Sequence, residues 1–511
     1  MSDPEKQAVS ADALPSEQSL PEAAPKDVPA SEQSVQVDDE KAFLVDFEPG
    51  DPRNPKNWSR AKRWYMTYVA SLLAFNATFA SAAPAGIATN LIEQFGLSQE
   101  LAVLTISLFV AGYCVGPLFW GPLSEQYGRR PIFLVSFPIY TCFQLGCALS
   151  HNKASIIVFR LLGGMFAAAP LTNSGALISD IWDAKTRGKA ITLFVLAPFI
   201  GPALGPLVGG YISDSGVSWR WLFWVLTIFA GSCFAIQVFT LPETYAPILL
   251  VQKARHLRRE TGDQRYHAPF ETVQKLGLAE RLRQTLLRPF KILFQEPMLF
   301  ATTVYMSFMY GTVYLLFEAF PVVFQEGHGF SPGKTGLMYI PLIIGSLLGG
   351  VCYLVFFHPR YEAAVEAHKP NLVPPEIRLD MAMTFAPLFA VTFFWFGWTS
   401  FPSISFWAPM MAGMSLGMSV ICLFLALFNY IIDTYLFAAA SALAANTVVR
   451  SSAGATFPLF ATQMYNALNP RWASTLLGCF ACLLLPIPFV LKRYGAALRA
   501  KSRYAPNVYG L

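Results

Sequence analysis

The sequence predicts an all-α membrane protein in which twelve transmembrane helices form two halves of six. Of the 511 residues, 54% are hydrophobic and only 14% are charged, whereas a typical soluble protein carries about 25% charged residues. Apolar stretches of about 20 residues, the length that a helix needs to cross a bilayer core, recur twelve times, and one long polar segment separates the first six from the last six. This composition excludes a disordered protein, a coiled coil and a protein that coats nucleic acid.

The twelve predicted spans lie near residues 64–87, 101–122, 131–149, 155–178, 189–212, 219–241, 298–322, 335–357, 381–400, 405–428, 434–457 and 472–491. Only Asn429 to Asp433 separate the tenth span from the eleventh, so we expect Asp433 in a solvated turn. Two halves predict a substrate site near the midplane between them, as in carriers built from structural repeats. Because the halves share too little identity to align, this prediction rests on hydropathy, and twelve spans without internal symmetry are the alternative.

Basic residues predict the orientation, because Lys and Arg are enriched in cytoplasmic loops. With the amino terminus inside, the inward segments carry 28 Lys and Arg residues and the outward segments carry 4. Both termini are therefore expected in the cytoplasm. The predicted domains are a disordered acidic cytoplasmic tail (1–52), an N-terminal six-helix half (53–241), a central cytoplasmic loop (242–297), a C-terminal six-helix half (298–492) and a cytoplasmic tail (493–511).

The sequence favours transport driven by an ion gradient over enzymatic chemistry. All eight cysteines fall inside apolar blocks, where a thiol behaves as a small hydrophobe. The closest approach to a phosphate-binding loop is Gly333-Lys334-Thr335, but the required first glycine is replaced by His328. We find no Ser/His/Asp set and no metal-ligand cluster, so we expect no enzyme activity, no cofactor, no metal and no nucleic-acid partner.

The connection between spans 2 and 3 carries the most specific motif. It runs from Gly121 through Glu125 to Gly128, Arg129 and Arg130 and combines a helix end, a tight turn and two guanidinium groups beside a carboxylate. The string resembles the G-x-L-[AS]-[DE]-x-x-G-R-[RK] signature of the major facilitator superfamily, with Glu125 where Asp is usual. The resemblance implies the major facilitator fold and a cytoplasmic gate between the two halves, in which Glu125 pairs with an arginine.

Span 5 carries a repeated glycine and proline pattern, in which glycines spaced by four share one helix face and let another helix approach closely. The pattern resembles the G-P-x-x-G-P-x-x-G-G antiporter motif, which in this superfamily distinguishes proton-coupled exporters from most uptake carriers. Its residues are Pro198, Gly201, Pro202, Gly205, Pro206, Gly209 and Gly210. A packing face without a transport role is the simpler alternative.

Four further segments are similar to the fungal twelve-span drug:H⁺ antiporters. They are Asp51–Trp58, Leu241–Tyr245, Leu316–Pro321 and Ala444–Arg450, and the resemblance covers about residues 50–495. Membership of this branch implies export of drugs, fungicides, polyamines or self-made toxic metabolites across the plasma membrane.

Ionisable residues at bilayer depth are costly and therefore mark candidate functional positions. Arg160 in span 4 resembles the arginine to which the family assigns proton coupling. Glu318 in span 7 is flanked by Phe317 and Phe320, and desolvation there favours its neutral form, as a proton carrier or polar substrate contact requires. The alternative is that Glu318 lies near the outer end and only fixes helix packing.

Four other polar residues have predicted positions. Asp180 and Arg450 are expected near the cytoplasmic side as parts of the inner gate, although Arg450 could instead snorkel to the interface. Asn76 and Asn446 lie on apolar spans 1 and 11 as candidates for the substrate cavity, with interhelical hydrogen bonding as the alternative.

We therefore predict a monomeric, proton-coupled antiporter that exports amphipathic organic compounds by alternating access. Its partners are a small organic substrate, protons and membrane lipid. The 43 Phe, 20 Tyr, 11 Trp and 14 Met residues are compatible with an apolar or cationic ligand. The alternatives are a proton-linked importer or polyamine carrier of the same fold, and a transport-dead sensor.

Overall fold

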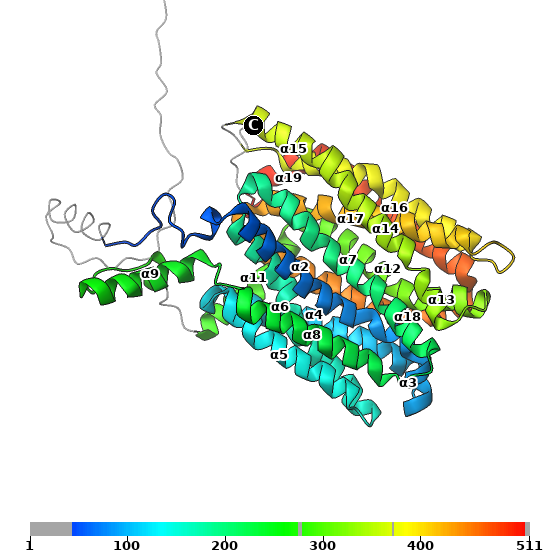
Figure 1. The fold of residues 1–511 in the computed structure, drawn as a ribbon. Helices are drawn as coiled ribbons and strands as arrows, with labels where there is room; N and C mark the ends of the chain where they lie inside the picture. Colours follow the sequence, from blue (N-terminus) through cyan, green and yellow to red (C-terminus); the bar gives the residue numbers. More distant parts are fainter. Residues whose placement is uncertain (1–42, 274–277, 370–371, 506–511) are drawn as a thin grey trace, which may run out of the picture.

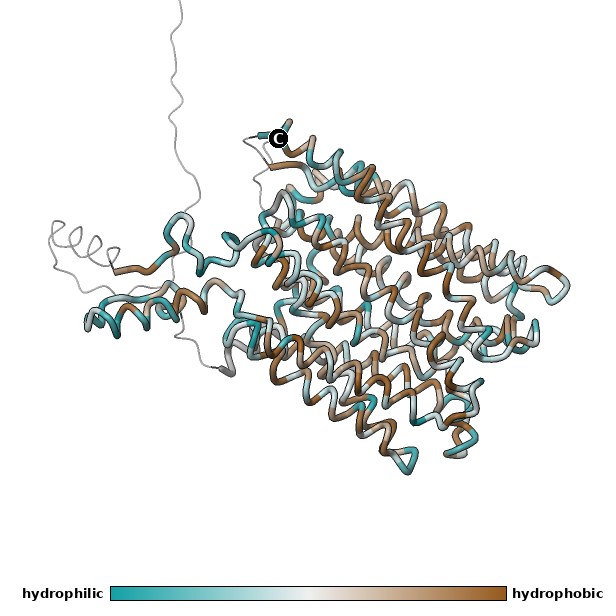
Figure 2. Tube along the Cα trace, viewed as in Figure 1, coloured by the Kyte–Doolittle hydropathy of each residue, from teal (hydrophilic) through white to brown (hydrophobic). Residues whose placement is uncertain are grey.

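The computed structural model describes residues 43–273, 278–369 and 372–505, and these residues form a bundle of long helices (Figure 1). Eleven helical segments in the described part are long and apolar enough to cross a membrane. Figure 2 shows that hydrophobic residues run along the bundle, whereas hydrophilic residues collect at its two ends and on α9 (Ala246–Thr261). The chain is therefore a multi-pass membrane protein.

Six crossings precede the central connection. The first is α2 (Arg60–Ala82), which continues through the 3-10 turn η2 (Ala83–Ile87) into α3 (Ala88–Phe95). It is followed by α4 (Gln99–Tyr127), α5 (Arg129–Ala148), α6 (Lys153–Ile181), α7 (Ala184–Asp214) and α8 (Arg220–Thr240). Side chains cap several of these helices, as when Ser59 and Asn152 accept hydrogen bonds from backbone N–H groups in the first turns of α2 and α6.

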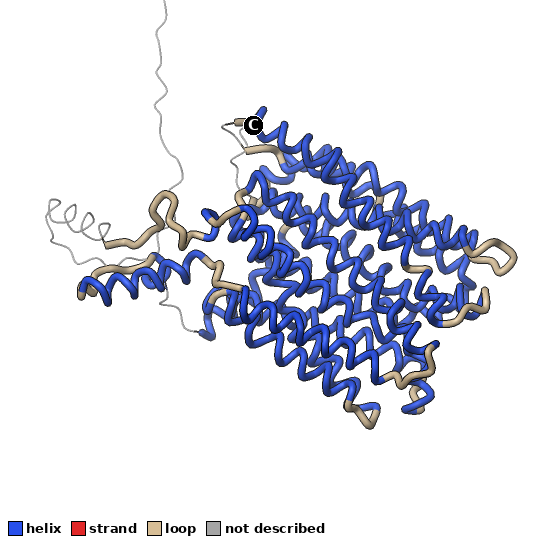
Figure 3. Tube along the Cα trace, viewed as in Figure 1, coloured by secondary structure: helices blue, strands red, loops and turns tan. Residues whose placement is uncertain are grey.

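The central connection and the second half are also helical (Figure 3). The connection contains α9, α10 (Pro269–Val273) and α11 (Leu278–Gln295). The second half comprises α12 (Pro297–Phe320) with a π-helical end at Pro321–Gly327, α13 (Pro332–Leu337), α14 (Ile340–Cys352), α15 (His358–His368), α16 (Leu379–Thr399), α17 (Trp407–Tyr435), α18 (Ala439–Leu484) and α19 (Pro486–Ala500).

The long helix α18 contains a chain reversal that supplies the twelfth crossing. Asn469 has a non-helical backbone with φ 60° and ψ 156°, and Pro470 follows it. The hydroxyl groups of Tyr465 and Ser474 lie 3.0 Å apart, although nine residues of straight helix would separate them by about 13 Å. The chain therefore folds back at Asn469, and the predicted count of twelve spans is confirmed.

The predicted boundary between spans 10 and 11 is wrong. Helix α17 continues to Tyr435, and only Leu436–Ala438 connect it to α18. Asp433 is thus a helical residue whose carboxylate accepts a hydrogen bond from Arg378 Nε at 2.8 Å and another from the Tyr361 hydroxyl. Its side chain is 14% exposed. The sequence could not reveal this partner, because Arg378 lies 55 residues earlier in the chain.

The two ends of the bundle differ in the segments they carry (Figure 1). We call the end at which α2 begins and α19 finishes the α9 end, because α9 projects from it. We call the opposite end the α13 end. The turn that contains Asn469 lies at the α13 end, whereas the turn between α17 and α18 lies at the α9 end.

Residues 43–58 form an ordered segment that we call the strap. Val45 N–H donates to the His267 carbonyl, and Val45 packs with Val251 and Ala254 of α9. Asp51 pairs with Lys253 at 2.8 Å. The prediction of a disordered tail is therefore wrong for residues 43–52, and residues 1–42 lie outside the described residues.

The carboxyl-terminal tail is shorter than predicted. Helix α19 continues to Ala500, and Arg499 of this helix pairs with Glu376.

The Asp51–Lys253 pair makes the strap sensitive to acid. The hydrogen bond from Lys253 and the Arg53 N–H lower the pKa of the Asp51 carboxyl. The folded state therefore favours the carboxylate. The ionised Asp51 carboxylate contributes fully to the stability of the folded strap above the ordinary pKa of about 4, and this contribution is lost as the pH falls through the lowered pKa. We expect D51N to expose the strap to proteases at neutral pH and acidification below about pH 4 to do the same in the unaltered protein.

Limited proteolysis with mass spectrometry of the cleavage sites measures this exposure. The matched control is D46N, because Asp46 bonds to Lys253 through its backbone carbonyl and its side chain contacts only the N–H of Phe47. Equal protection of the D51N strap and the unaltered strap at neutral pH would contradict the assigned role of the pair.

Candidate functional site

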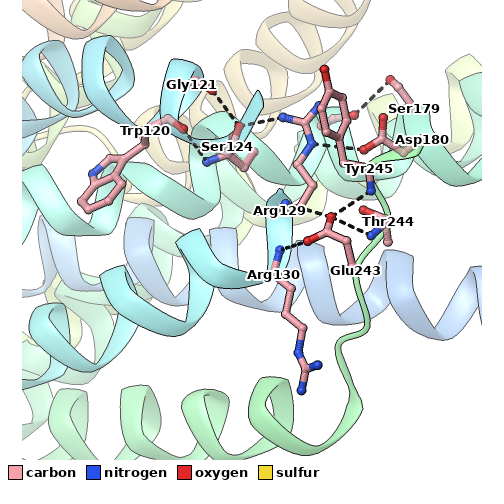
Figure 4. Close-up of polar contacts among 12 residues, drawn as sticks. Trp120, Gly121, Ser124, Arg129, Arg130, Ser179, Asp180, Glu243, Thr244 and Tyr245 are labelled. Atoms are coloured by element: carbon pink, nitrogen blue, oxygen red, sulfur yellow. Dashed lines mark hydrogen bonds and ion pairs between the residues drawn. The ribbon is translucent and has the colours of Figure 1, made fainter. Parts of the chain in front are cut away.

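The turn between α4 and α5 holds Arg129 in a network of polar contacts (Figure 4). Its Nε atom lies 3.1 Å from Asp180 of α6, and its Nη1 donates to the Ser124 hydroxyl at 2.7 Å. The guanidinium also lies over the Tyr245 ring, 4.6 Å from the centroid. Because Arg129 is 7% exposed, these contacts satisfy a charge that water reaches poorly.

Glu243, which follows α8, completes this network (Figure 4). Its carboxylate accepts the backbone N–H groups of Arg129 at 2.9 Å and Arg130 at 3.1 Å, which are the first two residues of α5. A carboxylate at a helix N-terminus satisfies otherwise unpaired donors and complements the helix dipole. Gly128 has φ +98°, and a Cβ there would collide with this carboxylate. Glycine is therefore required at position 128 for two reasons: it can adopt this positive φ angle, and it has no side chain that would meet the Glu243 carboxylate.

The predicted partner of the arginines is corrected by this geometry. Arg129 pairs with Asp180, whereas Glu125 is exposed on the last turns of α4. Gly121 lies on the same helix, with a Thr172 methyl group 3.9 Å from its would-be Cβ. The polar contacts of Arg129 and Asp180 join α4, α5, α6 and the segment after α8, all within the first half. The motifs do not predict the role of Glu243, although it lies within Leu241–Tyr245, one of the segments similar to the fungal drug:H⁺ antiporters.

The glycine face of α7 packs against the end of α2 and the following turn η2, and its spacing predicts such a close approach. A Cβ on Gly205 would lie 2.6 Å from the Ala83 nitrogen, and one on Gly209 would lie 2.6 Å from the Ala83 oxygen. A Cβ on Gly201 would collide with the Thr78 hydroxyl. Pro198, Pro202 and Pro206 all lie inside the helix. The backbones of α7 and α2 therefore approach more closely than side chains would allow.

The far end of α7 touches the second half. A Cβ on Gly210 would meet the backbone of Pro332 at the start of α13. The Asp214 carboxylate accepts hydrogen bonds from the Ser331 hydroxyl at 2.6 Å and the Gly333 N–H at 3.0 Å. The same helix thus packs on its own half through three glycines and joins the other half at the α13 end.

Arg160 is fully buried in the first half, and three backbone carbonyls accept its hydrogen bonds. They belong to Thr105 of α4 at 2.6 Å and to Ala80 and Ser81 of α2 at 2.9 and 2.7 Å. The guanidinium lies 4.0 Å from the centroid of the Phe109 ring. Arg160 therefore ties α6 to α2 and α4 without a carboxylate partner among these contacts.

The two asparagines proposed for the cavity are used in interhelical hydrogen bonds. Asn76 accepts from the Tyr140 hydroxyl at 3.0 Å and lies 3.8 Å from the Cys233 sulfur. Asn446 donates to the Thr303 hydroxyl at 3.2 Å. Each is 1% exposed. Their amides link helices within one half, as the alternative of interhelical hydrogen bonding predicts. Their place in the substrate cavity stays a prediction.

Arg450 lies deeper than predicted. It is the twelfth residue of α18 (Ala439–Leu484), which places it about 16 Å from the start of the helix. Its guanidinium faces the rings of Tyr310 and Phe424, with centroid distances of 4.4 and 5.1 Å. The expected position at the inner gate is therefore wrong. The predicted span 434–457 already contained Arg450 as its seventeenth residue, so the expected gate position did not follow from the position of the residue within the span.

Glu318 lies near the α13 end, two residues before α12 gives way to its π-helical extension. It is 7% exposed, and Tyr339 and Thr462 lie near it. The carboxyl group is therefore buried rather than hydrated. This placement agrees with the predicted outer position and leaves its role in proton transfer a prediction.

Twelve crossings in two halves, joined by polar contacts such as those of Asp214, are the architecture of a membrane transporter. The chain belongs to the major facilitator superfamily, whose family model (Major Facilitator Superfamily) matches residues 69–458.

Two relatives illustrate the similarity. The chain is 40% identical over 463 residues to the efflux pump FUB11 of Gibberella moniliformis, covering 91% of this chain and 78% of that protein. It is 40% identical over 487 residues to the citrinin biosynthesis cluster MFS transporter mrr1 of Monascus ruber, covering 94% and 96%. Among solved structures, the proton:xylose symporter XylE shares the fold with a TM-score of 0.60 at 16% identity, covering 86% of this chain and 96% of that one.

The α7–α2 contact predicts that G205A destabilises the protein. A methyl group at this position meets the backbone of Ala83, and overpacking of this kind costs about 1 to 3 kcal/mol. Thermal unfolding of the purified protein in detergent measures the change. The matched control is G231A in α8, where a Cβ meets nothing within 4 Å, and we expect no loss there. Equal unfolding temperatures for G205A and G231A would contradict the inferred close packing.

The Arg129–Asp180 pair predicts that D180N destabilises the first half. Removing the carboxylate leaves a nearly buried guanidinium with one charged partner fewer, and a hydrogen bond to a charged group contributes about 1.5 to 3 kcal/mol. The same thermal measurement applies. D183N is the control, because Asp183 is 62% exposed and its oxygen lies 4.0 Å from Arg63, a pair of little expected value. A D180N protein as stable as D183N would refute the assignment.

Proposed function

We propose that the protein is a proton-coupled exporter of amphipathic organic compounds. The observation that carries the proposal is its 40% identity, over nine-tenths of the chain, to proteins named as an efflux pump and as a transporter of a citrinin biosynthesis cluster. The closely packed G-P-x-x-G-P-x-x-G-G face of α7 supports the exporting direction. Drugs, fungicides and self-made toxins are all compatible substrates.

Contacts between the halves at both ends support alternating access. At the α13 end, Asp214 bonds to the segment around α13, and Gln463 of α18 donates to Glu100 of α4 at 3.3 Å. At the α9 end, Lys189 of α7 pairs with Glu362 of α15 at 3.3 Å. Such partly exposed polar contacts contribute little each, so they can break and re-form as the halves rock.

In this proposal, Glu318 of the second half exchanges the proton, and Arg160 holds α6 against α2 and α4 in the first half. Glu318 is a nearly buried carboxyl group, so its ionisation is coupled to its exposure as the halves move. Arg160 binds only backbone carbonyls, and loss of its contacts would separate α6 from α2 and α4. The network of Gly121, Glu125, Gly128, Arg129, Arg130 and Asp180 stabilises the first half beside the gate.

The proposed location is the plasma membrane, with both termini and the α9 end in the cytoplasm. The 28 to 4 distribution of Lys and Arg residues supports this orientation. The protein acts as a monomer in this proposal, in contact with membrane lipid.

Purified protein in sealed vesicles tests the coupling. With a pH gradient imposed and citrinin or a naphthalene derivative as the cargo, we expect cargo to move against the direction of proton flow and a protonophore to abolish the movement. E318Q should reduce gradient-driven accumulation at least about tenfold, because the amide cannot exchange a proton. E326Q, an exposed neighbour, is the control. Cargo movement that ignores the gradient would reject the antiporter, and movement along with protons would indicate an importer.

A further inference from the structure

The middle of the second half contains a cation surrounded by aromatic rings. The Arg450 guanidinium of α18 lies over Tyr310 of α12 at 4.4 Å and over Phe424 of α17 at 5.1 Å from the ring centroids. The two rings come from two different helices. They flank the Arg450 guanidinium.

The three residues lie at one depth. Tyr310 is the fourteenth residue of α12, which starts at Pro297, and Phe424 lies eleven residues before the end of α17 at Tyr435. At 1.5 Å per residue, both are about 16 to 20 Å from the α9 end of their helices, as is Arg450. A bilayer core is about 30 Å thick, so the cluster lies close to its midplane.

The first half contributes a third aromatic ring to this cluster. The Phe199 ring of α7 lies 5.1 Å from the Phe424 ring and 6.4 Å from the Tyr310 ring. Close by, the hydroxyl groups of Ser81 and Tyr314 lie 2.9 Å apart, and Ser452 donates to the Cys114 sulfur at 3.4 Å. The Arg450 cluster is thus at the seam between the halves, the place where alternating access exposes a site to each side in turn.

The Arg450 guanidinium has no acceptor in the described part of the chain. Its buried Nε atom has no hydrogen-bond partner, and neither an ion pair nor a hydrogen bond involves its side chain. Two other poorly exposed arginines differ. Arg160 binds three carbonyls, and Arg378, in the turn before α16, pairs with Asp433. A charge held at bilayer depth needs a compensating partner, and aromatic faces supply only part of it.

We propose that Arg450 binds an anionic group of the transported compound, so that the cargo is an aromatic or otherwise apolar molecule with one carboxylate or sulfonate. This inference rests on the proposed transport function and specifies its substrate class. The planar guanidinium fork matches such a group in two parallel hydrogen bonds. The rings of Tyr310, Phe424 and Phe199 stack on the apolar body. A neutral compound could offer hydrogen-bond acceptors but would leave the positive charge of the guanidinium without a counter-charge.

Matched probes separate charge from shape. Naphthalene-1-sulfonate is an anion at every pH used, naphthalene-1-sulfonamide is its neutral counterpart, and trimethyl(1-naphthyl)ammonium is a cation of similar size. Equilibrium binding of each radiolabelled probe to purified protein, with thermal unfolding measured in parallel, is the readout. We expect the sulfonate to bind at least about tenfold more tightly than either other probe, because one charge-assisted hydrogen bond is sufficient for that factor.

The variants assign this preference to Arg450. R450Q should abolish the preference for sulfonate while leaving sulfonamide binding unchanged, and R450K should retain part of it. R471Q is the matched control, because Arg471 also lies over aromatic rings, those of Trp398 and Trp472, but at the α13 end beside the Asn469 turn. R471Q should bind all three probes as the unaltered protein does.

Two results would overturn the inference. One is an unaltered protein that binds the amide or the cation as tightly as the sulfonate. The other is an R450Q protein that keeps the preference for sulfonate, even if it unfolds at a lower temperature, since this would make Arg450 a packing residue held by its rings. Proton-driven movement of a neutral or cationic probe in vesicles would then leave the proposed function intact. Sulfonate binding without any proton-driven movement would instead reject the proposed function alone.

Discussion

Within the hydrocarbon, each polar group must find its partner inside the protein, and this requirement organises the bundle. Arg160 meets it with three carbonyls from two helices. At the end of the bundle, Arg129 is likewise held by Asp180, a serine hydroxyl and an aromatic face. Asn76 and Asn446 meet it with side chains of neighbouring helices. Because association in lipid gains little from burial of apolar surface, such contacts and close backbone packing decide which helices are neighbours.

Close packing matters most along α7. Its glycines bring it against α2 in the first half, and its last turns meet α13 in the second. A helix with this position belongs to one half and forms part of the wall of the other. Both contacts bring backbone close to backbone, at Gly205 and Gly209 on one side and at Gly210 on the other. The contact with α13 adds hydrogen bonds from Ser331 and Gly333 to the Asp214 carboxylate.

Much of this arrangement could be predicted from the sequence, because hydropathy and glycine spacing are local properties. The twelve crossings and the glycine face follow from them directly. The partners of charged residues are not local. Glu243 reaches the start of α5 from 114 residues away, and Asp433 is bonded to a residue in a different predicted loop. The surroundings of Arg450 are not local either, because Tyr310 and Phe424 lie on other helices.

The unpaired guanidinium at the midplane also bears on the energy available for transport. If an anion leaves the cell as one proton enters, each cycle transfers two elementary charges in the same electrical sense. The membrane voltage then adds about 2.3 kcal/mol per charge for each 100 mV. A carrier of neutral cargo would gain only half of this. One arginine between aromatic rings would thus make the exporter respond to voltage as well as to acidity, and a depolarised cell would export its cargo with less driving force.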